Sequence, residues 1–334
     1  MLSFLHFYRI ILTVTVLITG PALGAEIVIK FSHIASRDSP KGLAATHFKE
    51  AAERLTRGRV RVDVYPDSQL FKDGEELEAL QMNSVQMVAP TFSKFSTIGF
   101  HEFEVFDLPF LFRNISDVHR VTQGPIGRTL LGSLDRQGII GLGFWDNGFK
   151  NMSANVPLHS PQDMRGLRMR IQPSRVLANQ MTALGATPFA LSFADTYQFL
   201  GNGLIDGTET TPSLFYTLGL INLQKYLTMT QHGYLGYVVI TNKRFWESLP
   251  KEIQVALTAA INETTTYVNT IAIQKNESDL EIIARSGRTT VIALNPTERR
   301  LWFDAMSAVE MQSQQRVGKE LIQNIRKELS ETSQ

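Results

Sequence analysis

Hydrophobic and polar positions follow two alternating periods along this chain of 334 residues. The apolar run at residues 27–31 and the every-second-residue valines at 60–64 are both typical of β-strands. Between them, Ser39 and Pro40 form a helix-start signal, and apolar residues follow at the spacing of one helical face. A strand, a helix and a strand in this order predict a βαβ unit with a right-handed crossover.

The alternation of strands and helices continues to about residue 242. We expect further strands at residues 85–89, 139–145, 167–171, 187–191 and 234–241. Capping residues and prolines predict helices that begin at Asp73, Ser116, Pro125, Ser160, Ser174 and Ser192. No glycine-serine linker separates the two sets of elements. The pattern therefore predicts two α/β lobes joined by several ordered crossings.

After residue 250 the pattern changes to helical spacing throughout. Residues 253–271 and 296 to about 329 predict two long amphipathic helices, which we expect to brace both lobes from outside. Residues 91–113 contain seven phenylalanines in an irregular pattern. Most of these rings are expected to pack in the core, and the alternative is an aromatic wall for a polar pocket.

Two arginines interrupt the apolar strand at residues 167–171. Strands of a covered parallel sheet are normally apolar on both faces. Arg168 can reach solvent at the strand start, but Arg170 lies near the carboxyl end, where open α/β sheets bind ligands. A guanidinium keeps its charge and presents a planar fork that matches a carboxylate. We hypothesise that Arg170 binds the carboxylate of a small acid; the alternative is a structural ion pair with an Asp or Glu of the protein.

Residues 1–25 have the pattern of a secretory signal peptide. Arg9 is followed by an apolar stretch at residues 10–18, and small residues at 22–25 offer a cleavage site. The apolar stretch is short for a membrane span, so a retained anchor is the weaker alternative. No later segment is long and apolar enough to span.

Charge and cysteine content narrow the class of protein further. Removing Arg9 from the 33 basic residues leaves 32, which equals the 32 acidic residues. A mature chain without net charge gives no reason to expect nucleic acid or an anionic membrane as a partner. The absence of cysteine excludes disulfides, thiolate metal sites and cysteine nucleophiles. These features fit an exported protein of a bacterial periplasm.

Motifs of common catalytic and nucleotide-binding sites are absent. The sequence has no Walker A loop, no Gly-x-Gly-x-x-Gly fingerprint, no Gly-x-Ser-x-Gly elbow and no histidine pair at metal-ligand spacing, so we expect no cofactor or metal. Polar residues gather instead at predicted strand ends: His33, Ser93, Lys94, Lys150, Arg170, Gln172, Thr208, Glu209 and Thr210. Cations and hydroxyl groups dominate this set, which favours binding an anion over transforming it.

Short runs spread over nearly the whole mature chain carry a family likeness. They include Phe31-Ser32-His33, Ser39-Pro40-Lys41-Gly42, Phe106-Asp107-Leu108-Pro109-Phe110, Gly148-Phe149-Lys150, Leu191-Ser192-Phe193-Ala194, Asp206-Gly207-Thr208-Glu209 and His232-Gly233-Tyr234. In these runs the chain resembles the periplasmic solute-binding proteins of TRAP transporters, in particular the branch that binds C4-dicarboxylates.

The resemblance implies a type II-like periplasmic binding protein rather than an enzyme. Each lobe would be a mainly parallel sheet flanked by helices, with a long helix bracing both lobes. We assign residues 26–147 and 236–275 to the first lobe, and 148–235 and 276–334 to the second. The lobes would close on a small organic acid and deliver it to a membrane permease pair.

The resemblance also implies roles for single residues. Arg170 would pair with the substrate carboxylate, Lys150 would assist it, and Phe193 would line the cleft, while His33 and Ser93 face them from the other lobe. The complete predicted ligand-binding set is Arg170, Lys150, Thr210, Phe193, Ser93, His33, Gln172 and Glu209.

Two departures from the family pattern leave the ligand open. Thr210 and Leu214 stand where the family usually has asparagine. A plain dicarboxylate such as succinate or malate is the default expectation, and a different or bulkier carboxylate is the alternative. Two other functions remain as alternatives: a sensory protein that presents a ligand to a receptor, and an exported enzyme with His33 or Glu209 as its base.

Overall fold

The computed structural model describes residues 27–331, so the predicted signal peptide at residues 1–25 lies outside the described residues. The strands are β1 (Ile27–Ser32), β2 (Val60–Tyr65), β3 (Met87–Val88), β4 (Ile139–Ala154), β5 (Arg168–Ile171), β6 (Thr187–Ala190), β7 (Gly207–Thr210), β8 (Tyr226–Asn242) and β9 (Thr290–Ile292). The α-helices are α1 (Pro40–Leu55), α2 (Glu76–Gln81), α3 (Ile115–Gln123), α4 (Pro125–Ser133), α5 (Arg175–Ala183), α6 (Thr196–Gly201), α7 (Pro212–Thr217), α8 (Lys243–Ser248), α9 (Lys251–Arg285), α10 (Pro296–Val317) and α11 (Lys319–Ser330). Short 3₁₀ helices occur at Phe92–Ile98 (η1), His101–Asp107 (η2), Leu134–Gln137 (η3), Pro161–Met164 (η4) and Leu220–Asn222 (η5).

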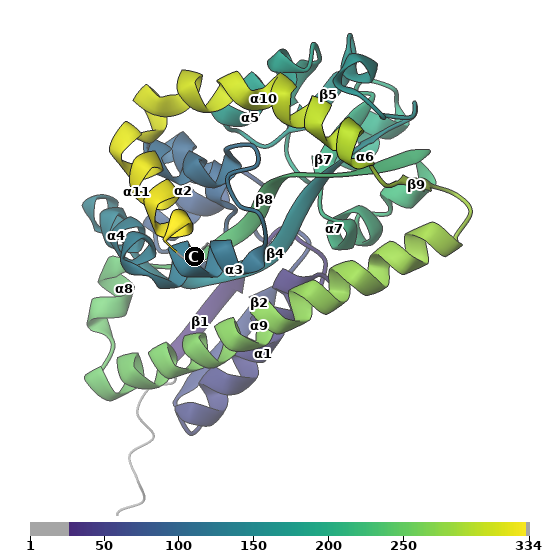
Figure 1. Cartoon of the computed structure of the whole chain (residues 1–334). Helices are drawn as coiled ribbons and strands as arrows, with labels where there is room; N and C mark the ends of the chain where they lie inside the picture. Colours follow the sequence, from purple (N-terminus) through teal and green to yellow (C-terminus); the bar gives the residue numbers. More distant parts are fainter. Residues whose placement is uncertain (1–26, 332–334) are drawn as a thin grey trace, which may run out of the picture.

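Two long antiparallel strands, β4 and β8, form the spine of one mixed sheet. Its order is β2-β1-β3-β8-β4-β7-β5-β6, and β9 pairs with β8. The strands β1, β2 and β3 are parallel to one another on one side of the spine, and β5, β6 and β7 are parallel on the other. We call these groups, with their helices, the N-terminal half (β1–β3, α1, α2) and the central half (β5–β7, α5–α7). Figure 1 shows β1 and β2 low in the molecule and β5 and β7 high, with β4 and β8 running between them.

The first βαβ unit has the predicted form. Strand β1 pairs in parallel with β2, and α1 connects them. The Ser39 hydroxyl accepts a hydrogen bond from the Gly42 backbone N–H and caps α1, as its sequence position predicts. Gly42 is required by space, because a Cβ atom there would lie 2.3 Å from the Ser36 carbonyl oxygen. The first turn of α1 therefore packs directly on the loop that follows β1.

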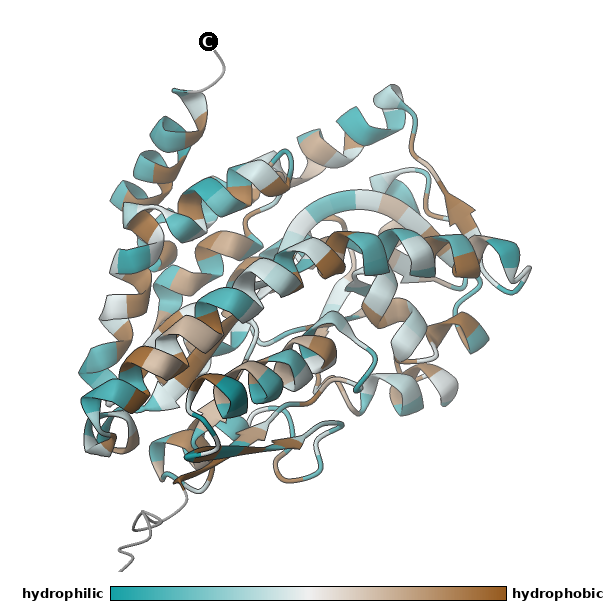
Figure 2. Ribbon diagram, turned by 90° about the horizontal axis from the view of Figure 1, so that it is seen from below, coloured by the Kyte–Doolittle hydropathy of each residue, from teal (hydrophilic) through white to brown (hydrophobic). Residues whose placement is uncertain are grey.

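Helix α9 connects the two halves along one side of the molecule. It has 35 residues, which gives a length of about 50 Å. It contacts α1 of the N-terminal half, β4 of the spine and α7 of the central half. Figure 2 shows hydrophobic and hydrophilic residues alternating along this helix, as expected for one packed face and one solvated face. The α/β class and the long bracing helix predicted from the sequence are thereby confirmed.

Several predicted element boundaries are wrong for identifiable reasons. The strand expected at residues 139–145 continues as β4 to Ala154, because register shifts at Asp146–Gly148 absorb residues that read as a turn. The helix expected from Pro296 to about residue 329 is broken at Gly318, whose φ of 108° does not fit a helix. The predicted lobe boundaries at 147/148 and 235/236 fall inside β4 and β8, so that division remains a proposal.

Two predicted caps are also wrong. Helix α3 is capped by Asn114, whose side chain accepts from the Asp117 N–H, rather than by Ser116. Asp73 does not cap α2, because its carboxylate binds Lys94 and the Phe193 backbone instead.

The phenylalanines of residues 91–113 pack in the core, as predicted. All of these rings except Phe110 are buried around η1 and η2.

Candidate functional site

A small cavity lies between the two halves. The N-terminal half and β8 contribute Ile34, Ala35, Lys41, Thr91, Leu235 and Tyr237 to its lining. The central half contributes Arg170, Gln172, Phe193, Thr210 and Leu214. The cavity thus brings together four of the predicted ligand residues, Arg170, Gln172, Phe193 and Thr210. The other four, His33, Ser93, Lys150 and Glu209, lie outside its lining.

Arg170 presents its guanidinium to this cavity from β5. The side chain is only 4% exposed, and its Nε donates to the Leu191 carbonyl oxygen at 3.1 Å. Its Nη2 lies 4.0 Å from Asp73 Oδ2, too far for a hydrogen bond. Burial lowers the pKa of Arg170, whereas Asp73 and Glu209 act in the opposite direction. The guanidinium is therefore a buried cation with one acid 4.0 Å away, and its terminal nitrogens donate no hydrogen bond to the described residues.

Asp73 connects the two halves beside Arg170. Its Oδ2 accepts a hydrogen bond from the Phe193 backbone N–H at 2.7 Å, and its Oδ1 is paired with Lys94. Although burial opposes ionisation, Lys94 and Arg170 hold the pKa of Asp73 below its usual value. Lys94 is in turn paired with Glu76. Lys94 is thus shared by Asp73 and Glu76, and Arg170 lies 4.0 Å from Asp73 without a hydrogen bond to it.

Further hydrogen bonds cross between the halves at the cavity. Gln172 Nε2 donates to Thr91 Oγ1 at 2.8 Å, and Ser96 Oγ donates to the Pro173 carbonyl oxygen at 2.8 Å. Ser93 Oγ donates to Asp107 Oδ1 at 2.9 Å and lies 3.4 Å from Gln172 Oε1. The two halves are therefore held together around the cavity, in a closed arrangement.

Lys41 is the second cation of the cavity and comes from the first turn of α1. It is 1% exposed, and its Nζ donates to the Ala89 carbonyl oxygen at 3.1 Å. The same Nζ lies 4.3 Å from the centre of the Tyr237 ring, a cation–π contact. Burial lowers the pKa of Lys41 to about 7; Lys94 acts in the same direction, and Glu76 and Asp73 against it. No carboxylate of residues 27–331 lies within 4.0 Å of this ammonium group.

Lys150 and Glu209 belong to a separate cluster, which we call the buried network: Lys150, Asp107, Glu209 and His232. Lys150 Nζ lies 3.3 Å from Asp107 Oδ1 and 3.1 Å from Glu209 Oε1. His232 Nε2 lies 3.2 Å from Glu209 Oε2. Despite the opposing effect of burial, Lys150 and His232 lower the pKa of Glu209 to about 2. The charge of Lys150 is thus balanced by the protein's own acids.

Strand geometry explains why Glu209 does not line the cavity. Glu209 and Thr210 are neighbours on β7, and successive side chains of a strand point to opposite faces. Thr210 lines the cavity, so Glu209 points to the face that holds Lys150. The last predicted residue, His33, is buried behind Lys41. Burial and then Lys41 lower the pKa of His33 to about 3, so its ring is neutral.

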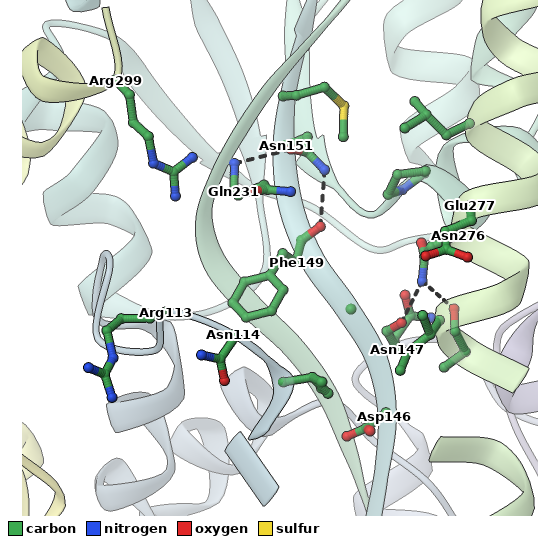
Figure 3. A pocket seen from close by; sticks show the side chains of 17 residues that line it. Arg113, Asn114, Asp146, Asn147, Phe149, Asn151, Gln231, Asn276, Glu277 and Arg299 are labelled. Carbon is green, nitrogen blue, oxygen red and sulfur yellow. Dashed lines mark hydrogen bonds between the residues drawn. The ribbon is translucent and has the colours of Figure 1, made fainter. Parts of the chain in front are cut away.

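A larger pocket lies elsewhere, between β4, β8, α9 and α10. Figure 3 shows amide side chains from the spine and from α9 around it. Asn151 Oδ1 accepts from the Gln231 backbone N–H at 3.1 Å, and Asn276 Nδ2 donates to the Asn147 carbonyl oxygen at 2.6 Å. These amides satisfy the backbone where β4 and β8 are irregular. The pocket therefore has a structural use, and the smaller cavity has the chemistry of an anion site.

Three polar residues that line the cavity were not predicted from the sequence: Lys41, Thr91 and Tyr237. A signal for Lys41 was available, because a cation in the first turn of a helix is disfavoured by the helix dipole. Its presence there needs a reason. Thr91 and Tyr237 gave no such signal.

Comparison with known proteins now assigns the family. The sequence profile of the bacterial extracellular solute-binding proteins, family 7 (DctP), matches residues 31–316. The C4-dicarboxylate-binding periplasmic protein DctP of Rhodobacter capsulatus is 49% identical over 302 residues, which is 90% of this chain and 91% of that protein. The chain therefore belongs to the family 7 extracellular solute-binding proteins, the solute-binding proteins of TRAP transporters.

Solved structures agree with this assignment. A TRAP periplasmic solute-binding protein from Shewanella oneidensis with bound succinate is 40% identical, with a TM-score of 0.89 over 91% of this chain and 99% of that one. A protein of the same kind from Pseudomonas aeruginosa with bound L-malate is 40% identical, with a TM-score of 0.84 over 86% of this chain and 99% of that one. The predicted two-lobed binding-protein fold and family are thereby confirmed. Within residues 27–331, no helix combines the length and hydrophobicity that a membrane span needs.

Proposed function

We propose that this protein captures a small organic acid, a C4-dicarboxylate or a closely related carboxylate, in the cavity between its halves. The observation that carries the proposal is Arg170, a 4%-exposed guanidinium whose nearest acid is 4.0 Å away and whose terminal nitrogens make no hydrogen bond to the described residues. A carboxylate would supply the bidentate partner that the protein does not. The ligands bound in the two solved relatives, succinate and L-malate, are acids of this kind.

Binding would act by closing the two halves. The open form separates Arg170 and Gln172 from Thr91 and Asp73, which contact them across the cavity in the closed form. An acid that touches both halves binds the closed form better, and it shifts the equilibrium by that difference in affinity. The closed protein would then deliver its ligand to the membrane permease of a TRAP transporter.

The cavity favours a short acid. Leu214, Leu235 and Phe193 give it apolar walls that suit the methylene groups of a small chain. Leu214 brings no hydrogen-bonding side chain to the wall, so a hydroxylated ligand finds no polar partner at that position. We therefore place succinate ahead of more heavily hydroxylated acids.

We further propose that the protein works in the periplasm, after cleavage of a signal peptide at residues 1–25. What weighs against the enzyme alternative is the state of its candidate bases. His33 has its pKa lowered to about 3 and Glu209 to about 2, and neither lines the cavity. A general base that works near neutral pH needs a pKa close to that pH. No observation favours the sensory alternative over transport.

The test is a thermal-shift screen of the mature protein against succinate, L-malate, fumarate, glutarate, butyrate and galactonate. A ligand at a hundred times its Kd should stabilise the protein by about 2.7 kcal/mol. We expect the four-carbon dicarboxylates to raise Tm most. If no organic acid raised Tm, or if only neutral solutes did, the proposed function would be wrong.

A further inference from the structure

Three buried lysines lie in or near the cavity, and one of them differs from the others. Lys94 is paired with Asp73 and Glu76, and Lys150 with Asp107 and Glu209. Lys41 has one carbonyl oxygen and one aromatic ring as partners and no carboxylate within 4.0 Å among the described residues. A buried cation without an anion is costly, and the cost is offset only when an anion joins it.

Lys41 and Arg170 reach the cavity from different halves. Lys41 stands on α1, Arg170 stands on β5, and both line the same cavity. The lining also includes the apolar side chains of Ile34, Leu214 and Leu235. It thus offers two cations, one from each half, together with apolar surface that suits methylene groups.

We propose that Lys41 binds the second carboxylate of a dicarboxylate whose first carboxylate is bound by Arg170. Lys41 is then the residue that selects diacids over monoacids of equal length. It also couples recognition to closure, because only a ligand with two carboxylates contacts cations of both halves. This inference rests on the proposed function and specifies which side chain distinguishes the substrate class.

The charged and titratable groups around Lys41 support a role near neutral pH. Glu76 and Asp73 face it from α2 and the segment before it, Lys94 from η1, His33 from the end of β1 and Tyr237 from β8. With burial dominant, the pKa of Lys41 falls to about 7, while the pKa of Tyr237 is raised and that of His33 is about 3. Lys41 is therefore the lining residue whose charge changes between pH 6 and 9, and a bound carboxylate would keep it protonated.

The experiment compares succinate with butyrate, which has the same four carbons and one carboxylate, by calorimetry at pH 6.5. For the wild-type protein we expect succinate to bind at least about 100-fold tighter. Lys41→Gln and Lys41→Met should each weaken succinate binding by about 100-fold and change butyrate binding by less than about threefold. Lys41→Arg keeps the charge and should retain part of the preference.

Lys49→Gln is the matched control. Lys49 lies on the same helix, but it is partly exposed and paired with Glu53. This change should leave both affinities as they are. Folded Lys41→Gln and Lys41→Met proteins that kept the wild-type preference for succinate would overturn the inference.

A measurement on the wild-type protein covers the case in which these variants do not fold. If Lys41 binds the second carboxylate, raising the pH from 7 to 9 should weaken succinate binding by up to about 100-fold, one decade per pH unit, because Lys41 must first take up a proton. Butyrate binding should change little. A succinate-to-butyrate preference that stayed constant from pH 6 to 9 would also overturn the inference.

The two proposals fail differently. A wild-type protein that binds neither acid contradicts the proposed function itself. A protein that binds succinate through Arg170 but whose preference does not depend on Lys41 or on pH contradicts only this inference.

Discussion

The cavity and the buried network are two clusters of buried charge with opposite balances. In the network, Lys150 has two carboxylates within 3.3 Å, and His232 contacts one of them. In the cavity, Arg170 has one acid at 4.0 Å and Lys41 has none within 4.0 Å among the described residues. Ser93 lies between the clusters, near both Asp107 and Gln172. Buried cations in the two clusters thus differ in whether the protein itself supplies the acids that neutralise them.

This difference separates stability from binding. Removing a buried cation that is paired with acids of the protein leaves those acids unpaired and destabilises the folded state. A buried cation without an acid lowers the stability of the folded protein, and it can form an ion pair with a ligand instead. Substitutions in the two clusters should therefore affect different measurements.

The largest effect is expected for Lys150→Met. This change leaves Asp107 and Glu209 buried and without their cation, which should lower the free energy of unfolding by about 3–5 kcal/mol. Urea denaturation without ligand measures it. The folded fraction should still bind succinate, because Lys150 does not line the cavity. Loss of succinate binding with full stability would mean that Lys150 is a ligand residue after all.

The next effect is expected for Arg170→Ala, and it concerns binding. Losing the carboxylate contact should weaken succinate binding by about 2–5 kcal/mol, measured by calorimetry. The ligand-free protein should keep its stability within about 1 kcal/mol, since Asp73, the acid 4.0 Å from Arg170, keeps Lys94 as its cation. Arg170→Lys should also bind poorly, because a single ammonium cannot replace the planar fork. Wild-type affinity in either variant would contradict the role of Arg170.

Local sequence signals predicted the fold well where an element is defined by its own residues. The cap of α1 at Ser39, the cap of α5 at Ser174 and the parallel pairing of β1 with β2 all follow from short patterns. The continuation of β4 through Asp146–Gly148 does not, because the same residues can turn or bulge. Pairing with β8, distant in the sequence, decides between the two.

The site was predictable to the extent that strand position identifies it. That Arg170 lines a cavity could be predicted, because an arginine near the carboxyl end of a buried strand is unusual. Lys150 satisfied a similar rule, yet its neutralising acids are 43 and 59 residues away in sequence, and no local pattern reveals them. Lys41 was not predicted although its place in the first turn of a helix is unusual for a cation. That position alone does not show burial, which depends on tertiary packing.

A smaller effect is expected from His33, which tests the electrostatics beside Lys41. The pKa of His33 is about 3 in the folded protein and near 6.5 when unfolded. The unfolded chain therefore binds more protons, and stability is lost as pH falls below 6.5. Between pH 6.5 and 5 the contribution of His33 to the free energy of unfolding falls by about 2 kcal/mol. This fall should be absent in His33→Gln. The measurement is the difference in unfolding free energy between the two proteins at each pH. That comparison cancels contributions common to both, including that of His119, whose raised pKa has the opposite sign. A pH-independent difference would show that His33 is not held neutral.

The smallest effect is expected for the hydroxyl group of Thr91 at the cavity, and the neighbouring hydroxyl group of Ser93 at the buried network serves as its comparison. Thr91 Oγ1 accepts from Gln172 Nε2 across the cavity, whereas Ser93 Oγ donates to the network carboxylate of Asp107. Thr91→Val keeps the shape and removes one bond between the halves. It should weaken succinate binding by about 1 kcal/mol, mainly through faster dissociation, because that bond joins the two halves in the closed arrangement. Ser93→Ala should instead lower the free energy of unfolding by about 1.5–3 kcal/mol, because its acceptor is a charged buried group. Stopped-flow dissociation and urea denaturation of both variants measure the two effects. If Thr91→Val slowed association and left dissociation unchanged, the Thr91–Gln172 bond would form before the ligand is enclosed, and closure would not be the step that holds the ligand.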